Sequence, residues 1–353
     1  MGAVSDDMML DALERVAPGT DLREALDYVI AANTGGLIVI GDSPAVDKVC
    51  NGGFVLDVPF TPQRLFELAK MDGAIILDDG CATILKANVH LVPDPTLPTS
   101  ETGMRHRTAE RVSRQTAALV ISVSQRRSLV TLYRRDDKVV LEAIDVVLAK
   151  ANQAVQTLQR FRARLDETSD RLTALEFDDA VTLGDVVSVL QRQLMLQRVG
   201  REVARYVTEL GSGGRLVRLQ AEELTASVEE QHVMLLRDYV AGAGPRKASL
   251  VRSTLAQTTR EQILDGASLA QTLGFPMSGD ILEYHVQPRG YRVLQRIPML
   301  PGVVASRLIE RFATLKGLLQ ASEAQLDDVD GVGARRARAI RDGMRRMREH
   351  SQL

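Results

Sequence analysis

Cysteine is scarce in this chain: only Cys50 and Cys81 occur among 353 residues. Two cysteines without metal-ligand spacing provide neither a disulfide framework nor a cysteine-based zinc site. No apolar run approaches the roughly 20 residues that are needed to cross a bilayer. The first ten residues are acidic and lack the basic and then apolar order of a secretory signal peptide. We therefore expect a cytoplasmic protein with no membrane segment.

Charge of one sign is also lacking, because the formal net charge is only −2. The charges are nevertheless unevenly placed. Residues 289–353 carry 13 Lys and Arg against 7 Asp and Glu, a balance of +6, whereas the rest of the chain carries 31 against 39, a balance of −8. A basic end on an acidic body indicates a segment that binds a polyanion, and a merely solvated basic terminus is the alternative. The length predicts two or three domains.

Residues 1–145 alternate helical and strand patterns. Thr20 precedes an amphipathic stretch with acids in its first turn, and Thr61 with Pro62 opens another, so a helix is predicted after each. Short apolar runs typical of buried strands lie at residues 37–40, 74–77, 84–91, 117–123, 129–133 and 139–141. This alternation predicts an α/β domain, with a mixed sheet flanked by helices.

Strand patterns disappear from residues 146–288, and glycine is sparse there before the cluster at 211–214. Apolar residues recur instead at helical spacing, which predicts an all-α linker or spine. A helix over residues 145–165 would be about 30 Å long, at about 1.5 Å per residue. We expect this region to act as a spacer without chemistry of its own.

Residues 289–353 contain an internal repeat. The stretch Leu300-Pro301-Gly302-Val303 resembles Val329-Asp330-Gly331-Val332-Gly333, which follows 29 residues later. Each copy is predicted to be a tight glycine turn that opens a helix. A glycine at such a turn lets the backbone approach a phosphate, and the next helix presents unsatisfied N–H groups at its positive end. Two adjacent turns would grip phosphates with little regard for base sequence.

Seven arginines follow the second turn between Arg335 and Arg348, with Asp342 as the one acid among them. Such a helix adds the salt-dependent part of an affinity for nucleic acid. The segment resembles the tandem helix-hairpin-helix module of DNA repair proteins, closely in its second turn and partially in its first, where Val304 replaces a common second glycine. A helical protein–protein module that has lost DNA contact is the alternative. The resemblance implies an all-α domain that binds DNA through Gly302, Gly331, Gly333, Arg335, Arg336 and Arg338.

Three short motifs in the first region could carry chemistry. The first is Asp72-Gly73-Ala74, between a predicted helix and a predicted strand. A carboxylate at a strand edge, followed by residues with almost no side chain, can hold a divalent metal while a substrate lies against the backbone. An exposed Asp-Gly turn is the alternative interpretation.

The second motif, Arg105-His106-Arg107, precedes a helix predicted over residues 109–116. Cations at a helix N-terminus contradict the usual preference for acids there. The field of the helix and the cations therefore indicate a bound polyanion such as a triphosphate. Pairing of the arginines with the neighbouring acids Glu101 and Glu110 is the alternative.

The third motif runs from Ser122 to Arg127 and leaves a predicted strand. Serine hydroxyls at the end of a strand often face a ligand crevice in α/β sheets, but this motif alone favours neither a ligand nor a structural role. The order of the three motifs, together with residues 87–94 and 101–103, resembles the diadenylate cyclase domain. With the spine and the hairpins, essentially the whole chain resembles the diadenylate cyclases that carry a C-terminal helix-hairpin-helix domain. Met104 departs from the threonine common in relatives, which puts a hydroxyl contact in doubt.

The resemblance implies that two ATP molecules are condensed into cyclic di-AMP and two pyrophosphates across a face-to-face homodimer. Asp72 would be the catalytic residue and would hold Mg²⁺ or Mn²⁺. The residues implied to bind ATP are Gly73, Ala74, Leu91, Arg105, His106, Arg107, Thr108 and Ser124. The family further implies a homo-octamer whose activity branched DNA lowers.

Two alternatives remain. One is a DNA-binding structural or repair protein whose nucleotide domain only senses ATP. The other is a repair nuclease or ligase accessory protein, which leaves the Arg105–Arg107 cluster unexplained. The chain also has no ligase-type lysine motif and no dense cluster of acids typical of a nuclease.

Overall fold

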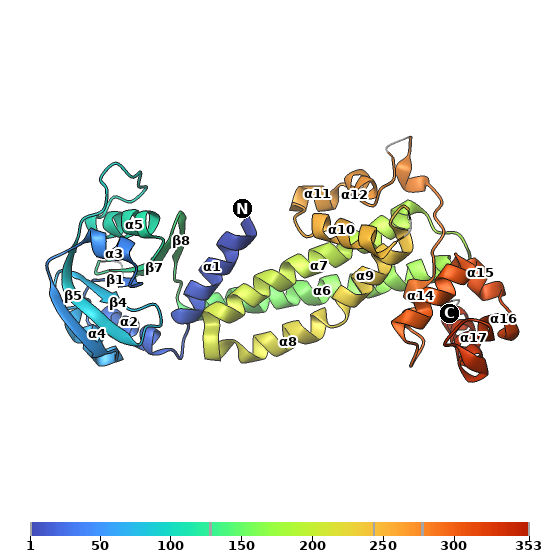
Figure 1. Ribbon diagram of the computed structural model, residues 1–353, viewed down its shortest axis with the longest axis horizontal. Coiled ribbons are helices and arrows are strands. Elements are labelled where there is room, and N and C mark those ends of the chain that lie inside the picture. Colours follow the sequence, from blue (N-terminus) through green and yellow to red (C-terminus); the bar gives the residue numbers. More distant parts are fainter. Residues whose placement is uncertain (1, 127–128, 243, 277–278, 352–353) are drawn as a thin grey trace. The chain divides into compact units, whose positions relative to one another are not determined.

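The computed structural model describes residues 2–126, 129–242, 244–276 and 279–351. Two compact units are present, one formed by residues 1–153 with 203–219 and the other by residues 154–202 with 220–353 (Figure 1). The long helices α6 (Ile144–Phe177) and α7 (Leu183–Leu210) contribute residues to both units. The predicted boundaries near residues 145 and 288 stay predictions. None of the described helices is long and apolar enough to cross a membrane.

The first unit contains an eight-stranded mixed sheet among its described residues, in the order β2-β5-β4-β1-β6-β7-β8, with β3 also paired to β5. Only β1 and β4 run parallel to each other, and the other neighbours are antiparallel. The strands are β1 (Gly36–Ile40), β2 (Cys50–Asn51), β3 (Phe54–Pro59), β4 (Ala74–Leu77), β5 (Thr83–Leu91), β6 (Leu119–Ser124), β7 (Leu129–Arg134) and β8 (Asp137–Val140). The mixed sheet flanked by helices is confirmed.

Both faces of this sheet are covered, because the strands alternate apolar side chains between two cores. One core joins the sheet to α1 (Gly2–Arg15), α2 (Asp21–Ala31) and α4 (Pro62–Leu68). The other joins it to α3 (Pro44–Val49) and α5 (Met104–Thr116). Figure 1 shows α3 and α5 on one side of the strands and α2 and α4 on the other. The predicted caps are confirmed, since the Thr20 and Thr61 hydroxyls accept from backbone N–H groups at residues 23 and 64.

The second unit is helical, apart from an isolated bridge between Thr182 and His285. Its larger core combines parts of α6 and α7 with α9 (Val228–Tyr239), α10 (Pro245–Leu255), α11 (Arg260–Leu264) and α12 (Gly266–Thr272). The helix expected over residues 145–165 is confirmed and is longer than expected. Helix α8 (Arg215–Thr225) begins in the first unit and ends in the second. A short 3₁₀ turn at Gly211–Gly214 belongs to the first unit, and another at Ile281–Glu283 belongs to the second.

A separate core organises the C-terminal helices of the second unit. These are α13 (Tyr291–Gln295), α14 (Gly302–Phe312), α15 (Leu315–Gln320), α16 (Glu323–Asp327) and α17 (Gly333–Ser351). The two repeats begin α14 and α17, as the sequence predicts. A Cβ on Gly331 would lie 3.3 Å from Cγ2 of Val304, and Arg307 forms a 2.8 Å ion pair with Asp330. The two glycine turns are therefore side by side.

Candidate active site

A cavity of about 890 Å³ opens at one end of the strands, beside the N-terminus of α5. It lies where β1 and β4 begin and where β5 and β6 end, since Gly36 pairs with Val123 and Ala74 pairs with Val89. Its volume falls within the range of small-molecule sites, about 300–1,000 Å³. The first unit alone supplies its walls.

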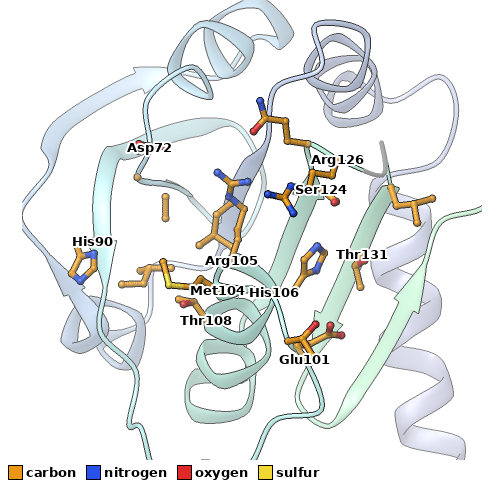
Figure 2. Close-up of a pocket in the computed structure, with 18 of the residues that line it drawn as sticks. Asp72, His90, Glu101, Met104, Arg105, His106, Thr108, Ser124, Arg126 and Thr131 are labelled. Carbon is orange, nitrogen blue, oxygen red and sulfur yellow. The ribbon is translucent and has the colours of Figure 1, made fainter.

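The pocket brings together residues from all three sequence motifs. Those predicted to bind substrate or metal that line it are Asp72, Gly73, Ala74, Leu91, Arg105, His106, Thr108 and Ser124. Figure 2 shows Asp72 and His90 on one side, His106 and Thr131 on the other, and Arg105 between them. The pocket thus combines a carboxylate, cations and hydroxyls in one chamber.

Arg107 is the predicted ATP-binding residue outside this lining. Helix α5 begins at Met104, five residues earlier than the predicted start, so the three basic residues lie within its first turn. Residues two positions apart on a helix point about 200° apart, since each residue turns about 100°. Arg105 therefore faces the pocket, whereas Arg107 is exposed and donates from Nη2 to the Thr102 carbonyl at 3.4 Å.

Gly73 is set between Asp72 and the buried strand β4. A Cβ at Gly73 would lie 2.3 Å from the carbonyl carbon of Asn88, so only glycine lets the two strands approach this closely. Asn88 itself has a left-handed φ of 53°, and the β4–β5 register shifts at this point. Such bulges re-aim side chains near functional sites. Asp72 is exposed at the pocket edge that results.

The acids near α5 are engaged away from Arg105. Glu101 pairs with Lys138 at 2.8 Å, and Glu110 pairs with Arg114 at 3.1 Å. The alternative interpretation, in which Glu101 and Glu110 pair with Arg105 and Arg107, is therefore not supported, because both acids pair with other cations. No ion pair of Arg105 occurs among the described residues, and a guanidinium at a helix N-terminus attracts anions. Helix α5 also lacks a side-chain cap at Gly103.

Further residues line the pocket. Asn88, His90 and Arg126 belong to stretches that the sequence motifs include but to which no role was assigned, and Thr131 and Lys138 carry no sequence signal. Tyr133 lies behind the pocket, and its hydroxyl oxygen is 2.9 Å from Nδ1 of His106. No sequence signal could pair positions 106, 133 and 138, because the packing of α5 on β7 and the pairing of β7 with β8 bring them together.

The serine motif divides between the core and the pocket. Ser124 is half-buried and lines the pocket, whereas Ser122 is fully buried and its hydroxyl has no hydrogen-bond partner among the described residues. Alternate residues of a strand face the same side, so both belong to the α5 face of the sheet. Arg127 lies outside the described residues.

The donor set determines whether Mg²⁺ or Mn²⁺ fits this pocket. Among the described residues, no group of three or more His, Cys, Asp or Glu could hold a metal by itself. Mg²⁺ is usually bound through one or two carboxylates together with substrate phosphates. Asp72 provides one exposed carboxylate, while Glu101 is engaged by Lys138. The residues therefore fit a cation that a bound nucleotide helps to coordinate.

The predicted DNA-binding residues gather around the two glycine turns of the second unit. Gly331 and Gly333 have left-handed φ values of 89° and 63°, which favour glycine. Arg335 and Arg338 are exposed, whereas Arg336 is half-buried and donates to the Gly331 carbonyl. The remaining predicted residue, Gly302, begins α14.

The fold and the pocket define an α/β domain with cationic side chains at a pocket, followed along the chain by a helical region. Residues 23–138 match the family model described as DisA bacterial checkpoint controller nucleotide-binding, and residues 141–282 match its linker region. The chain is 50% identical to the DNA integrity scanning protein DisA of Carboxydothermus hydrogenoformans, over 99% of both chains. It is 52% identical to the DisA protein of Symbiobacterium thermophilum, over 95% of both. The chain therefore belongs to the DisA family.

Similarity to solved structures is weaker. A crystal structure of a double mutant of DacA from Staphylococcus aureus covers 41% of this chain and 93% of its own, at 18% identity. The TM-score of 0.30 is too low for a comparison of the two folds.

Proposed function

We propose that the chain is a diadenylate cyclase, a nucleotidyltransferase that condenses two ATP molecules into cyclic di-AMP and two pyrophosphates. One observation carries the proposal: a single pocket gathers Asp72 with Arg105, His106, Thr108 and Ser124. The match of residues 23–138 to a nucleotide-binding family model supports it, as do relatives named for DNA integrity scanning.

The pocket residues suit a reaction that needs positioning and charge neutralisation more than covalent catalysis. Arg105 and His106 bind the triphosphate at the N-terminus of α5, and the Thr108 and Ser124 hydroxyls add donors. Leu91 and Ala74 form an apolar part of the pocket wall that contacts the nucleoside. When bound, a divalent cation held by Asp72 and the phosphates makes the 3′-hydroxyl more acidic and offsets phosphate charge. That hydroxyl loses its proton to water and attacks the α-phosphate of the second ATP, and pyrophosphate leaves. The equivalent attack by the 3′-hydroxyl of the second ATP on the first α-phosphate closes the ring and releases the second pyrophosphate.

One pocket holds one ATP, so the reaction needs two copies. The product has two-fold symmetry, and a C2 homodimer would place two identical pockets face to face. We propose this dimer as the catalytic unit of a homo-octamer in the cytoplasm. Diluting the enzyme tests this step, because the rate should fall faster than the enzyme concentration.

Mass spectrometry of the product tests the activity directly. The wild type, incubated with ATP and Mg²⁺ or Mn²⁺, should yield cyclic di-AMP, and Asp72→Asn should yield none. Asp57→Asn is the matched control, since Asp57 is exposed on β3 away from the pocket. If the wild type yields no cyclic dinucleotide, the alternative holds, in which the nucleotide domain only senses ATP.

We propose that the C-terminal helices bind branched DNA and thereby lower cyclase output. Two adjacent glycine turns followed by the arginines of α17 support binding to phosphates rather than to base edges. Replacing Arg335 and Arg338 by Ala should weaken binding to a four-way junction. The slope of log binding constant against log salt concentration should become shallower by about 0.9 for each lost phosphate contact. Arg260→Ala, on an exposed arginine of α11, is the control. ATP turnover unchanged by a saturating junction would contradict the regulatory part.

A further inference from the structure

A line of hydrogen-bonding groups runs from the surface to the ring of His106. Nζ of Lys138 lies 2.8 Å from Oε1 of Glu101, and the Tyr133 hydroxyl lies 3.0 Å from the same oxygen. The Tyr133 hydroxyl is also 2.9 Å from Nδ1 of His106. The four residues come from β8, the loop before α5, β7 and α5 itself. Three parts of the domain therefore converge on one imidazole.

The donor and acceptor roles along this line follow from the charges. The Lys138 ammonium lowers the pKa of Glu101, and a hydrogen bond from Tyr133 adds to this, so Glu101 is a carboxylate that only accepts. Burial raises the pKa of Tyr133, and Glu101 raises it further, so the phenol keeps its proton. Tyr133 has one proton to donate and Glu101 receives it. The phenol oxygen must therefore accept a hydrogen from Nδ1 of His106.

We propose that Tyr133 and Glu101 are positioning residues that keep a hydrogen on Nδ1 of His106 and present its Nε2 to the triphosphate. The inference rests on the proposed function, because it concerns how His106 meets a nucleotide. A histidine whose second nitrogen is bonded in this way has a fixed tautomer and a fixed ring orientation. Glu101 also attracts positive charge on the His106 ring. When the ring is also protonated at Nε2, this nitrogen donates a hydrogen bond to a phosphate oxygen.

Tyr133 offers a clean way to remove only the hydrogen bond. Its ring is 1% exposed and belongs to the core beneath α5, so Tyr133→Phe keeps the packing and loses the hydroxyl. Tyr28→Phe is the matched control, because the Tyr28 hydroxyl bonds Glu24 at the surface of the same unit. Melting curves of both variants should stay close to that of the wild type.

The tautomer is measurable without any nucleotide. In protein labelled with ¹⁵N-histidine, His106→Gln identifies the His106 signals among those of 5 histidines. We expect a ring with a hydrogen on Nδ1 in the wild type and in Tyr28→Phe. Tyr133→Phe and Glu101→Gln should both shift these signals. A wild-type ring with its only hydrogen on Nε2, or signals that Tyr133→Phe leaves unchanged, would overturn the proposal.

Nucleotide binding supplies the second readout. The probe is α,β-methylene ATP with Mg²⁺, titrated into the full-length chain. Tyr133→Phe should weaken binding roughly 3- to 10-fold, the usual effect of one lost hydrogen bond. In a His106→Gln background the same change should alter affinity less than about 2-fold, because Tyr133 acts through His106. Equal losses in both backgrounds would overturn the proposal. A wild type that binds no nucleotide would instead contradict the proposed function, while the tautomer measurement still decides this inference.

Discussion

The guanidinium of Arg105 occupies the space where a side chain at residue 35 would lie. A Cβ on Gly35 would be 2.1 Å from Nη1 of Arg105 and 3.2 Å from the Val123 carbonyl oxygen. Gly35 has no left-handed φ, so its backbone conformation does not demand glycine. The missing side chain instead makes room for a cation at the wall of the pocket.

Gly35→Ala should therefore impair binding more than folding. The close contact is with the end of a flexible side chain, so Arg105 moves rather than the sheet. We expect nucleotide affinity to fall about 10-fold, the loss of one charge-assisted hydrogen bond. Unfolding free energy should change by less than about 1 kcal/mol, because no buried apolar packing is lost at this half-buried position. Titration with a nucleotide and urea unfolding measure the two effects. Gly213→Ala is the control, since nothing lies within 4 Å of its Cβ, and unchanged affinity in Gly35→Ala would refute the expectation.

Gly73→Ala should show the opposite pattern, with a large effect on folding. The atoms in the way are the carbonyl carbon and Cα of Asn88 at 2.3 and 2.4 Å. Backbone cannot swing aside as a side chain does, so β5 must shift away from β4. Such overpacking typically costs about 1–3 kcal/mol. Urea unfolding followed by circular dichroism should show this loss, and Gly80→Ala, whose Cβ meets only ordinary contacts at 3.4 Å, should not. An unchanged midpoint for Gly73→Ala would show that the strands yield.

Local signals in the sequence predict local structure well here. Thr20 and Thr61 cap the helices that follow them because a cap needs only neighbouring residues. Strand β3 was missed, since its exposed edge pattern gives no apolar run. The order of strands could not be predicted, because it depends on pairings between distant segments.

The same distinction applies to the pocket. Each of its motifs could be found as a short run of residues, but the direction of each side chain could not. Arg105 and Arg107 are equivalent in the sequence motif, but both lie in the first turn of α5, which begins at Met104 and directs their side chains to different sides. Tyr133 carries no motif and reaches His106 only because β7 lies beside α5. Sequence thus identifies the chemistry of the site, and tertiary structure determines which groups share it.

His232 should make the second unit less stable in acid. It is 2% exposed, and burial lowers its pKa from 6.5 to about 4, helped by the charge of Arg252. The unfolded chain takes up a proton below about pH 6.5, whereas the folded one resists until about pH 4. Stability is therefore fully present above the unfolded pKa and is lost as the pH falls between these values. The shift corresponds to about 3 kcal/mol.

The test compares unfolding free energies at neutral pH and near pH 4. His232→Asn retains a donor for Oε1 of Gln193, which lies 3.0 Å from Nδ1 of His232, but does not titrate. The wild type should lose about 3 kcal/mol relative to this variant on acidification. His285→Asn, at an exposed histidine of the same unit, should follow the wild type. Parallel pH curves for the wild type and His232→Asn would contradict the argument.

A buried ion pair should contribute far more to the stability of the second unit than an exposed one on the same helices. Nε of Arg292 lies 2.9 Å from Oε1 of Glu176, with side chains 7% and 1% exposed. Asp238, which is also buried, accepts hydrogen bonds from the backbone N–H groups of residues 290, 291 and 292. Arg292→Leu would leave both carboxylates without a buried cation. Breaking such a pair from one side typically costs about 3–5 kcal/mol.

Arg296 provides the matched comparison. Its pair with Asp170 spans 3.8 Å, and the two side chains are 44% and 75% exposed. Solvent screens such a pair, so Arg296→Leu should cost less than about 1 kcal/mol. Glu176→Gln together with Arg292→Leu should recover part of the loss, because the double variant buries one charge fewer than Arg292→Leu alone. Chemical denaturation of the four chains measures these differences. If Arg292→Leu costs no more than Arg296→Leu, the buried carboxylates must already be neutral, and the cluster is held by hydrogen bonds alone.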